Sequence, residues 1–553
     1  MQKTKCYKKN DLVVLEITDL TEEGQGVGKC DGLVFFVKGS VMGDLVEARI
    51  LKVKKNYAYA KVEKLLKASP YRVTPLCPVA GKCGGCQLQH LSYEKELEWK
   101  EDRIAQSLIR IAGIPEEEVR GKGEGILGGK TERYRNKAQY PVQNRKELRE
   151  EIALGGRAFE EGKKAPEKEQ ESCDSLGIGF YGFHSHRIIE AEDCLINSAE
   201  NPLILNCIKE WAREYKISGY DEETGKGLLR HIFLRKGFST GEILLCLVLN
   251  GKSLPHGKEL WEKLQGLSLS AEEVGLQRGE DVYCGMDAQS EADVLCGENR
   301  KVPGKIVGLS MNINEGRGNA ILGRETRCLY GKDSIEDKIG ELSFSISVPS
   351  FYQVNPAQTE KIYGKALEYA ALTGEETVWD CYCGIGTISL FLAQKAKQVY
   401  GLEIVPEAIE NAKKNAEKNG LYNTEFYVGA AEEVLPKWVE EQKREGKDVG
   451  NLVDVVSLDP PRKGCDEACL SAVLELSPKR IVYVSCDPGS LARDIKYLGE
   501  GGYVLGKWVG IDNFPRTGHV ETVALLSKLD VDKHIDVEIK LDELDLTSAE
   551  SNI

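Results

Sequence analysis

The sequence contains no apolar run of 18 or more residues, and this lack excludes a membrane-spanning helix. Residues 1–5 also lack the apolar stretch that opens a secretory signal peptide. We therefore expect a cytoplasmic protein with no membrane partner, acting as a monomer. The composition is otherwise ordinary for a globular protein, with 41% hydrophobic and 29% charged residues.

Positive charge is also in short supply, since 74 Lys and Arg face 88 Asp and Glu and the net charge is -14. Such acidity disfavours nucleic-acid binding, because contacts to phosphate need Lys and Arg. The charge is unevenly distributed, however. Residues 1–67 hold 13 Lys and Arg against 9 Asp and Glu, whereas residues 528–553 hold 3 against 8. The net charge of the whole chain therefore does not exclude an RNA partner.

The chain has 17 cysteines, an odd number, and they are scattered. In a reducing cytosol they do not form a disulfide framework, and most are expected to be small core residues. Cys77, Cys83 and Cys86 differ because they share one glycine-rich loop. Three close thiols need a fourth ligand to complete a tetrahedral set, and Cys173 and Cys194 are the candidates. The spacing suits zinc and an iron–sulfur cluster equally well.

A length of 553 residues is too great for one hydrophobic core and predicts several domains. Residues 1–67 carry runs of β-forming residues separated by glycines, which predict five short strands in a small OB-like barrel. Such barrels commonly bind single-stranded nucleic acid, and a purely structural module is the alternative. The runs that define the strands lie at 12–17, 33–37, 44–50 and 57–62.

Residues 68–345 are expected to form a central α+β domain that includes the cysteine loop, with a helix at 92–112. A polar stretch near 156–174 lacks periodicity and is expected to be a mobile loop. Residues 346–530 alternate between strand and helix periods, which predicts a Rossmann-like, doubly wound parallel sheet. Residues 531–553 form an acidic tail.

A glycine-rich turn at 380–386 follows the first predicted strand of the C-terminal region. Its glycines let the backbone approach a ligand, and Glu403, which ends the next strand, suits ribose hydroxyls. A dinucleotide-binding turn carries a third glycine, whereas Ser389 occupies that position here. A nucleoside without a pyrophosphate, such as S-adenosylmethionine (SAM), therefore fits better than NAD.

Two later strands end in residues that suit chemistry on a uracil base. Asp459 can accept a hydrogen bond from the uracil N3–H, or it can cap the helix that follows. Cys486 can be an inert core thiol, but its thiolate can also add to uracil C6 and make C5 nucleophilic. A base must then remove the C5 proton, and His519 and Glu521 are the candidates.

The order of these motifs along the chain is specific: SFYQVNP at 350–356, the turn at 380–386, DPPR at 459–462, SCDP at 485–488 and HVE at 519–521. Together they resemble the RNA uracil-5-methyltransferase family of class I SAM-dependent enzymes. The resemblance covers nearly the whole chain and includes an N-terminal TRAM module. It implies methylation of uridine C5 in RNA, with Cys486 as nucleophile and Glu521 as the proton-abstracting base. It also implies SAM contacts from Gln353, Tyr382, Glu403 and Asp459.

For the cysteine loop, the resemblance implies a [4Fe-4S] cluster held by Cys77, Cys83, Cys86 and Cys194. The fourth ligand in the family follows a segment similar to residues 182–189, which favours Cys194. The resemblance also favours 23S rRNA over tRNA as the substrate, because bacterial tRNA enzymes of the family commonly lack both the cluster and the TRAM module.

The sequence departs from the family at Ala430, where an Asp often reaches the adenine amino group. Adenine recognition is then either looser or supplied by the backbone. Two other functions compete with uridine methylation. One is amino methylation of a base, although the motif for it has an aromatic residue where Arg462 stands, and it has no use for Cys486. The other is RNA binding without catalysis, which needs neither Cys486 nor Glu521.

Overall fold

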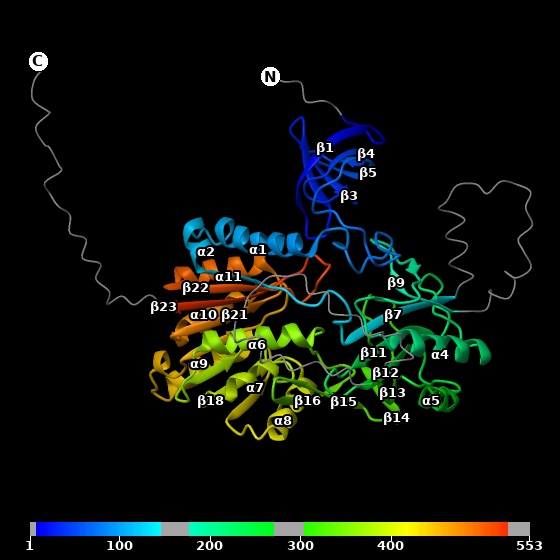
Figure 1. Cartoon of the computed structure of the whole chain (residues 1–553). Coiled ribbons are helices and arrows are strands. Elements are labelled where there is room, and N and C mark those ends of the chain that lie inside the picture. Colours follow the sequence, from blue (N-terminus) through cyan, green and yellow to red (C-terminus); the bar gives the residue numbers. More distant parts are fainter. Residues whose placement is uncertain (1–6, 145–175, 270–302, 529–553) are drawn as a thin grey trace, which may run out of the picture.

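The structure is a computed structural model that describes residues 7–144, 176–269 and 303–528 (Figure 1). The polar stretch near 156–174, Cys173 and the acidic tail at 531–553 lie outside the described residues. None of the described helices is both long enough and apolar enough to cross a membrane.

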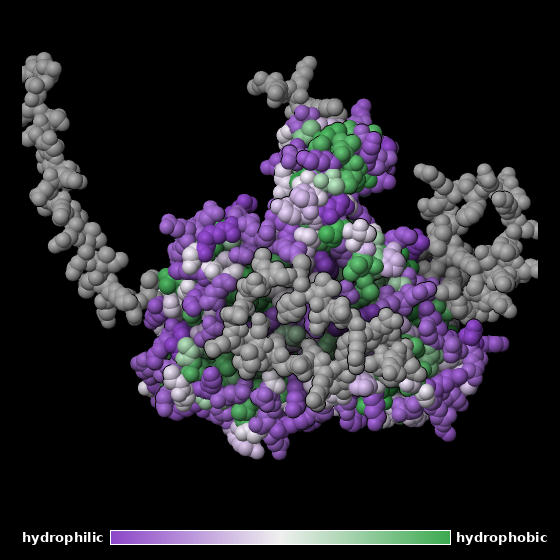
Figure 2. Space-filling model, in the orientation of Figure 1, coloured by the Kyte–Doolittle hydropathy of each residue, from purple (hydrophilic) through white to green (hydrophobic). Residues whose placement is uncertain are grey.

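The N-terminal strands close into a five-stranded barrel, which confirms the predicted OB-like module. Side chains alternate along its strands, so that Phe35 and Val37 are fully buried while Phe36 between them is partly exposed. The barrel stands above the rest of the molecule in Figure 1, and Figure 2 shows hydrophobic side chains gathered on its visible face. The strand order is β1-β2-β3-β5-β4, with β1 at Leu12–Leu20, β2 at Gly26–Cys30, β3 at Leu33–Lys38, β4 at Leu45–Val53 and β5 at Tyr57–Lys67.

The central part of the chain builds a six-stranded mixed sheet, in which β12 and β13 are parallel and the other neighbours antiparallel. Two helices, α4 (Asn201–Glu214) and α5 (Gly257–Gln265), share its core, where Trp211 is fully buried. A separate two-stranded ribbon pairs β9 (Phe180–Tyr181) with β10 (Ile188–Ile189). The sheet order is β14 (Glu325–Gly331), β13 (Lys305–Ile313), β12 (Glu242–Leu249), β11 (Leu229–Lys236), β7 (Lys137–Asn144) and β8 (Leu176–Ile178).

The C-terminal part builds an eight-stranded sheet whose first five strands are parallel, as the alternating periods predicted. Helices cover both faces and enclose two separate cores, one with α6 to α8 and the other with α9 to α11. The sheet order is β19 (Thr424–Val428), β18 (Gln398–Glu403), β17 (Thr377–Asp380), β20 (Val455–Leu458), β21 (Arg480–Ser485), β23 (Glu521–Lys528), β22 (Tyr503–Ile511) and β6 (Gly123–Leu127). The helices are α6 (Pro356–Ala370), α7 (Thr387–Ala393), α8 (Pro406–Lys418), α9 (Ala431–Arg444), α10 (Glu467–Leu476) and α11 (Pro488–Glu500), and a 3-10 turn spans Val449–Asn451.

Part of the segment expected in the central domain joins the C-terminal sheet instead. Strand β6 pairs in parallel with β22 at the sheet edge, and the helices α1 (Tyr93–Arg110) and α2 (Glu116–Lys122) precede it. Helix α1 packs there because its buried stripe of Ile104, Ala105 and Leu108 completes the second core. The hairpin of β15 (Ser334–Ile339) and β16 (Leu342–Ser347) likewise contributes to the first core.

A buried ion cluster fastens α1 to the end of β22. Lys100 is fully buried, and its Nζ lies 2.8 Å from Glu96 Oε1 and 2.7 Å from Asp512 Oδ1. The Tyr93 hydroxyl also donates to Asp512, at 2.9 Å. Because Asp512 begins the loop that leads to β23, this cluster fixes the path of that loop.

We expect Lys100→Met to destabilise the protein strongly, because it leaves the buried Asp512 without its cation and Glu96 with only Arg516, at 3.7 Å. Breaking a buried pair costs about 3–5 kcal/mol. Lys443→Met is the matched control, since it removes an exposed pair of equal length, 2.8 Å to Glu475, and should cost less than about 1 kcal/mol. Thermal unfolding followed by circular dichroism compares the two variants. Equal shifts of the midpoint would contradict the role of the buried cluster.

Candidate active site

The carboxyl edge of the C-terminal sheet gathers residues that the sequence placed on separate strands. Glu403 and Asp380 end β18 and β17, Asp459 and Cys486 follow β20 and β21, and Glu521 opens the antiparallel β23. These five strands are consecutive neighbours in the sheet. The edge of a parallel sheet where strands end is the usual ligand site of such folds. The topology therefore forms one continuous row from Glu403 and the glycine-rich turn, here called the expected cofactor side, to Cys486 and Glu521, the expected substrate side.

Strand pairing places the thiol beside the carboxyl group. Ser485 of β21 lies opposite Thr522 of antiparallel β23, so the next residues outward are Cys486 and Glu521. Cys486 is half-buried, and burial, reinforced by the charges of Glu521 and Asp459, raises the pKa of its thiol to about 12. The charge of Arg462 acts in the opposite direction.

Glu521 has the properties of a general base. Its side chain is buried, and burial raises its pKa from 4.5 to about 7. A hydrogen bond from Asn513 and the charge of Arg462 favour the ionised form. Asn513 is itself held by its amide, which donates to Gln353 Oε1 at 3.1 Å. A carboxyl group that titrates near neutral pH can both take up and release a proton.

Two further carboxyl groups crowd the same edge. Burial raises the pKa of Asp380 to about 6, and its Oδ2 accepts a hydrogen bond of 2.6 Å from the Ser389 hydroxyl. The pKa of Asp459 is raised well above its usual value by burial and then by the charges of Glu521 and Asp380.

The cofactor side contains the predicted turn. Gly384 and Gly386 have φ of 55° and 85°, a region in which residues with a Cβ are strained. Glu403 is fixed from both sides, because Oε2 accepts from the Gly384 N–H at 3.2 Å and Oε1 from the Val405 N–H at 3.0 Å. Tyr382 packs against the second core, and burial raises the pKa of its hydroxyl.

Apolar surface is exposed next to this turn. Ile404 follows β18 and is 63% exposed, and Val428 at the end of β19 is 50% exposed. Ala430 caps α9 without a side-chain hydrogen bond. The edge thus offers apolar contacts at the place where the family often has an Asp.

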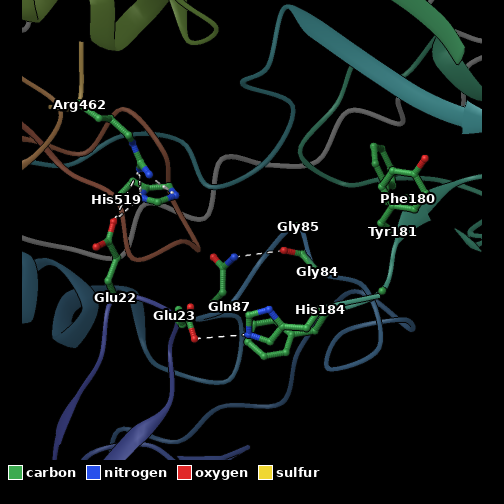
Figure 3. A pocket seen from close by; sticks show the side chains of 12 residues that line it. Glu22, Glu23, Gly84, Gly85, Gln87, Phe180, Tyr181, His184, Arg462 and His519 are labelled. Carbon is green, nitrogen blue, oxygen red and sulfur yellow. Dashed lines mark hydrogen bonds and ion pairs between the residues drawn. The ribbon is translucent and has the colours of Figure 1, made fainter. Parts of the chain in front are cut away.

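A cleft of about 620 Å³ opens beside the substrate side (Figure 3). At one end Arg462 and His519 meet Glu22, which comes from the barrel and was not predicted from the sequence. The Lys38 ammonium lies 4.7 Å above the ring of Phe183, which lines the cleft. The lining residues are Glu22, Glu23, Gly84, Gly85, Gln87, Phe180, Tyr181, Gly182, Phe183, His184, Arg462 and His519.

The four predicted cluster cysteines are electrostatic neighbours. Burial raises the pKa of Cys86 to about 11 and that of Cys194 to about 12. Cys83 and Cys77 raise the pKa of Cys86 further, and Cys86 and Cys83 do the same for Cys194. Among residues 7–144, 176–269 and 303–528, however, no group of three or more His, Cys, Asp or Glu side chains is arranged to hold a metal ion. The thiols are suitable metal ligands and lie near one another, but they are not arranged as a metal site.

Comparison with known proteins identifies the family. The family model described as tRNA (Uracil-5-)-methyltransferase matches residues 321–529, and the TRAM domain model matches residues 12–62. A relative from Halalkalibacterium halodurans, described as an uncharacterized RNA methyltransferase, is 43% identical over 518 residues, which are 94% of this chain and 97% of the relative. One from Clostridium acetobutylicum with the same description is 43% identical over 530 residues, 96% and 100% of the two chains.

The chain belongs to the RNA uracil-5-methyltransferase family. This confirms the resemblance seen in the sequence motifs. Among solved structures, the tRNA (uracil-54, C5)-methyltransferase of Pyrococcus abyssi, in complex with S-adenosyl-L-homocysteine, has a TM-score of 0.64 and 24% identity. The match covers 93% of this chain and 100% of that one. This chain therefore has the class I methyltransferase fold.

We expect the burial of Glu521 to make stability depend on pH. Since its pKa is raised from 4.5 to about 7, the folded state binds more protons between these values, and stability falls as the pH rises through this window. Glu521→Gln removes the cost of ionising the buried group, so the variant should unfold at a higher temperature than the parent at pH 8. The gain is at most about 3 kcal/mol.

The same comparison at pH 5 should show no gain, because Glu521 is then protonated in the folded parent. Glu410→Gln, which changes an exposed carboxyl group on α8, is the control. Thermal unfolding at both pH values measures the difference. A Glu521→Gln effect that is equal at pH 5 and pH 8 would show that Glu521 does not titrate in this window.

Proposed function

We propose that the enzyme transfers a methyl group from SAM to C5 of a uridine in RNA, with Cys486 as nucleophile and Glu521 as base. The observation that carries this proposal is the pairing of the half-buried thiol and the buried carboxyl group at neighbouring strand ends. Amino methylation of a base needs no thiol, and RNA binding without catalysis needs neither group. The pair is therefore best explained by a covalent uracil adduct.

In the proposed reaction Cys486 acts first and Glu521 second. Uracil C5 is a poor nucleophile, and addition of the Cys486 thiolate to C6 turns C5 into an enolate carbon that can accept a methyl group. Arg462 favours this attack because its charge lowers the pKa of Cys486. Glu521 then removes the C5 proton, and the electron pair re-forms the C5–C6 double bond and expels the Cys486 thiolate.

Asp459 is the residue proposed to recognise the base. It follows β20, the sheet neighbour of the strand β21 that precedes Cys486. Its carboxyl group can accept a hydrogen bond from the uracil N3–H.

SAM, bound at the cofactor side, would supply the methyl group to C5, and its sulfur would leave as the thioether of S-adenosyl-L-homocysteine. The turn at Gly384 and Gly386 gives the close backbone approach, and the rigidly held Glu403 suits the ribose hydroxyls. Ile404 and Val428 offer apolar contact to the adenine, in place of the carboxylate that Ala430 lacks. Gln353, Tyr382 and Asp459 are the further contacts that the family implies.

The barrel and the cleft support RNA as the partner. Phe36, Tyr57 and Tyr59 cluster on the outer face of β3 and β5, with ring centroids 5.5–5.8 Å apart. Partly exposed aromatic rings flanked by lysines form a surface on which single-stranded bases can stack. Lys38 on the same face contacts Phe183 in the cleft. The surface therefore continues from the barrel toward the catalytic residues.

For the RNA itself, 23S rRNA is the proposed substrate, on the strength of the TRAM module and the cysteine loop. The Pyrococcus abyssi structure shows that a tRNA enzyme can share this overall fold. The fold therefore does not select the RNA, and a direct comparison of the two RNAs is part of the test.

The catalytic roles predict opposite behaviour for two variants. Glu521→Gln can still form the adduct and accept the methyl group, but it cannot remove the C5 proton, so a covalent protein–RNA complex should accumulate. Cys486→Ala cannot form the adduct and should give neither complex nor product. Denaturing gels with SAM and labelled 23S rRNA or tRNA fragments show the complex as a shifted band, and the RNA that gives it identifies the substrate.

His519→Ala is the control for the identity of the base, because its ring faces Glu22 and Arg462 at the mouth of the cleft. We expect it to turn over without a trapped complex. A trapped complex in His519→Ala and none in Glu521→Gln would reverse the assignment. A complex formed by Cys486→Ala would refute the covalent mechanism.

The proposal extends to a [4Fe-4S] cluster on Cys77, Cys83, Cys86 and Cys194. Neighbouring thiols of the set raise the pKa of Cys83, Cys86 and Cys194, and thiolates are the ligands that such clusters use. Binding would need the loop to draw its thiols together. The cluster takes no part in the methyl-transfer steps and is assigned a role in folding or in positioning RNA.

We expect anaerobically purified protein to show a broad absorption band in the blue and to contain iron and sulfide. Cys194→Ala should abolish the band, whereas Cys173→Ala, outside the proposed ligand set, should retain it. Stoichiometric zinc without iron would overturn the iron–sulfur assignment and leave a zinc site on the same thiols.

A further inference from the structure

The loop between β1 and β2 of the barrel reaches the mouth of the active site. Glu22 in this loop has Oε1 at 3.1 Å from His519 Nδ1 and 3.7 Å from Arg462 (Figure 3). Its Oε2 lies 3.0 Å from Arg103 on α1. The hydrogen bond from His519, together with the charges of Arg103, His519 and Arg462, lowers the pKa of Glu22 to about 2. The barrel thus contributes a permanent anion to the loop that precedes Glu521.

The backbone fits as closely as the side chains. A Cβ on Gly518 would lie 1.9 Å from the carbonyl oxygen of Glu22, so only glycine allows this approach. Arg103 clamps both partners, since it pairs with Glu22 and donates to the Gly518 carbonyl. Steric fit and charge therefore hold the barrel loop against the segment that carries His519.

Glu22 and Arg462 contact His519 at the same ring nitrogen. Nδ1 lies 3.1 Å from Glu22 Oε1 and 2.6 Å from Arg462 Nη2, and Nε2 lies 3.3 Å from the same Nη2. The Arg462 guanidinium, which can only donate, therefore donates to the ring, and Glu22 also attracts it directly at 3.7 Å. The chain of contacts runs from Glu22 through His519 to Arg462.

Arg462 connects this series of contacts to the proposed catalytic residues Cys486 and Glu521. Its charge lowers the pKa of both Cys486 and Glu521, against the raising effect of burial. The side chain of Arg462 is 58% exposed, so without partners it is free to turn toward solvent. Its contacts with His519 and Glu22 keep the charge directed at the catalytic pair.

We infer that Glu22 of the barrel is a positioning residue for methyl transfer: through His519 it holds Arg462 where its charge favours the Cys486 thiolate. This inference rests on the proposed function and adds to it a barrel residue that acts on the catalytic thiol. The charged groups that face Cys486 are Glu521, Asp459 and Arg462. Glu22 is faced by His519, Arg103 and Arg462.

The test measures the thiol directly and needs neither RNA nor SAM. Iodoacetamide alkylation of the full-length protein is followed by mass spectrometry of the Cys486 peptide over a range of pH. Because only the thiolate reacts, Glu22→Gln should slow alkylation about three- to tenfold at a fixed pH and move the rate profile to higher pH. Glu23→Gln is the matched control, since this neighbouring carboxylate faces His184 instead, at 3.6 Å, and should leave the profile unchanged.

Arg462→Gln shows whether the effect passes through the arginine. It should slow alkylation at least as much as Glu22→Gln, and the double variant should be no slower than Arg462→Gln alone. Additive effects, or equal effects of Glu22→Gln and Glu23→Gln, would overturn the inference. If the variants alkylate as expected but the parent transfers no methyl group to uridine in RNA, the proposed function fails, and only the effect of Glu22 on the reactivity of the Cys486 thiol stands.

Discussion

A single buried lysine, Lys100, fixes the loop that leads to Glu521 in the candidate active site. Lys100 on α1 neutralises Glu96 and Asp512 where none of the three side chains reaches solvent. Since an unpaired buried charge costs several kcal/mol, neither partner can move away. The loop that Asp512 begins is fixed further by the Arg516 N–H, which donates to Glu96 at 2.7 Å. Glu521 follows this loop, so its position depends on a helix some four hundred residues earlier in the chain.

Burial at the carboxyl edge of the C-terminal sheet then raises the pKa values of the carboxyl groups there, those of Asp380, Asp459 and Glu521. The charges of Glu521 and Asp380 raise the pKa of Asp459 further, whereas the pKa of about 7 at Glu521 is the effect of burial. Arg462 opposes it from the exposed side. Burial raises the pKa of Cys486 and the charge of Arg462 lowers it, so the proposed role of Cys486 as nucleophile depends on the balance of these effects.

The sequence was sufficient for features that depend on local pattern. Alternating periods predicted the strands and helices after residue 355, and motifs at strand ends predicted which residues meet at the edge, because parallel strands all end there. It did not reveal that β6 joins this sheet or that α1 packs against it. An edge strand of five residues carries no signal of its partner. Asn513 and Glu22 were missed for the same reason: their roles come from long-range contacts between ordinary loop residues.

The position of the barrel is the last consequence of these contacts. A module joined only by a flexible linker would raise the local concentration of RNA without orienting it. Here Trp99 of α1 donates to Asp19 of the barrel at 3.2 Å, and Glu22 and Gly518 fit against each other. The aromatic face of the barrel is therefore held at a fixed angle to the cleft. On the proposed function, an RNA strand stacked on that face approaches the cleft from a fixed direction, because the barrel is held by these contacts and not by a linker alone.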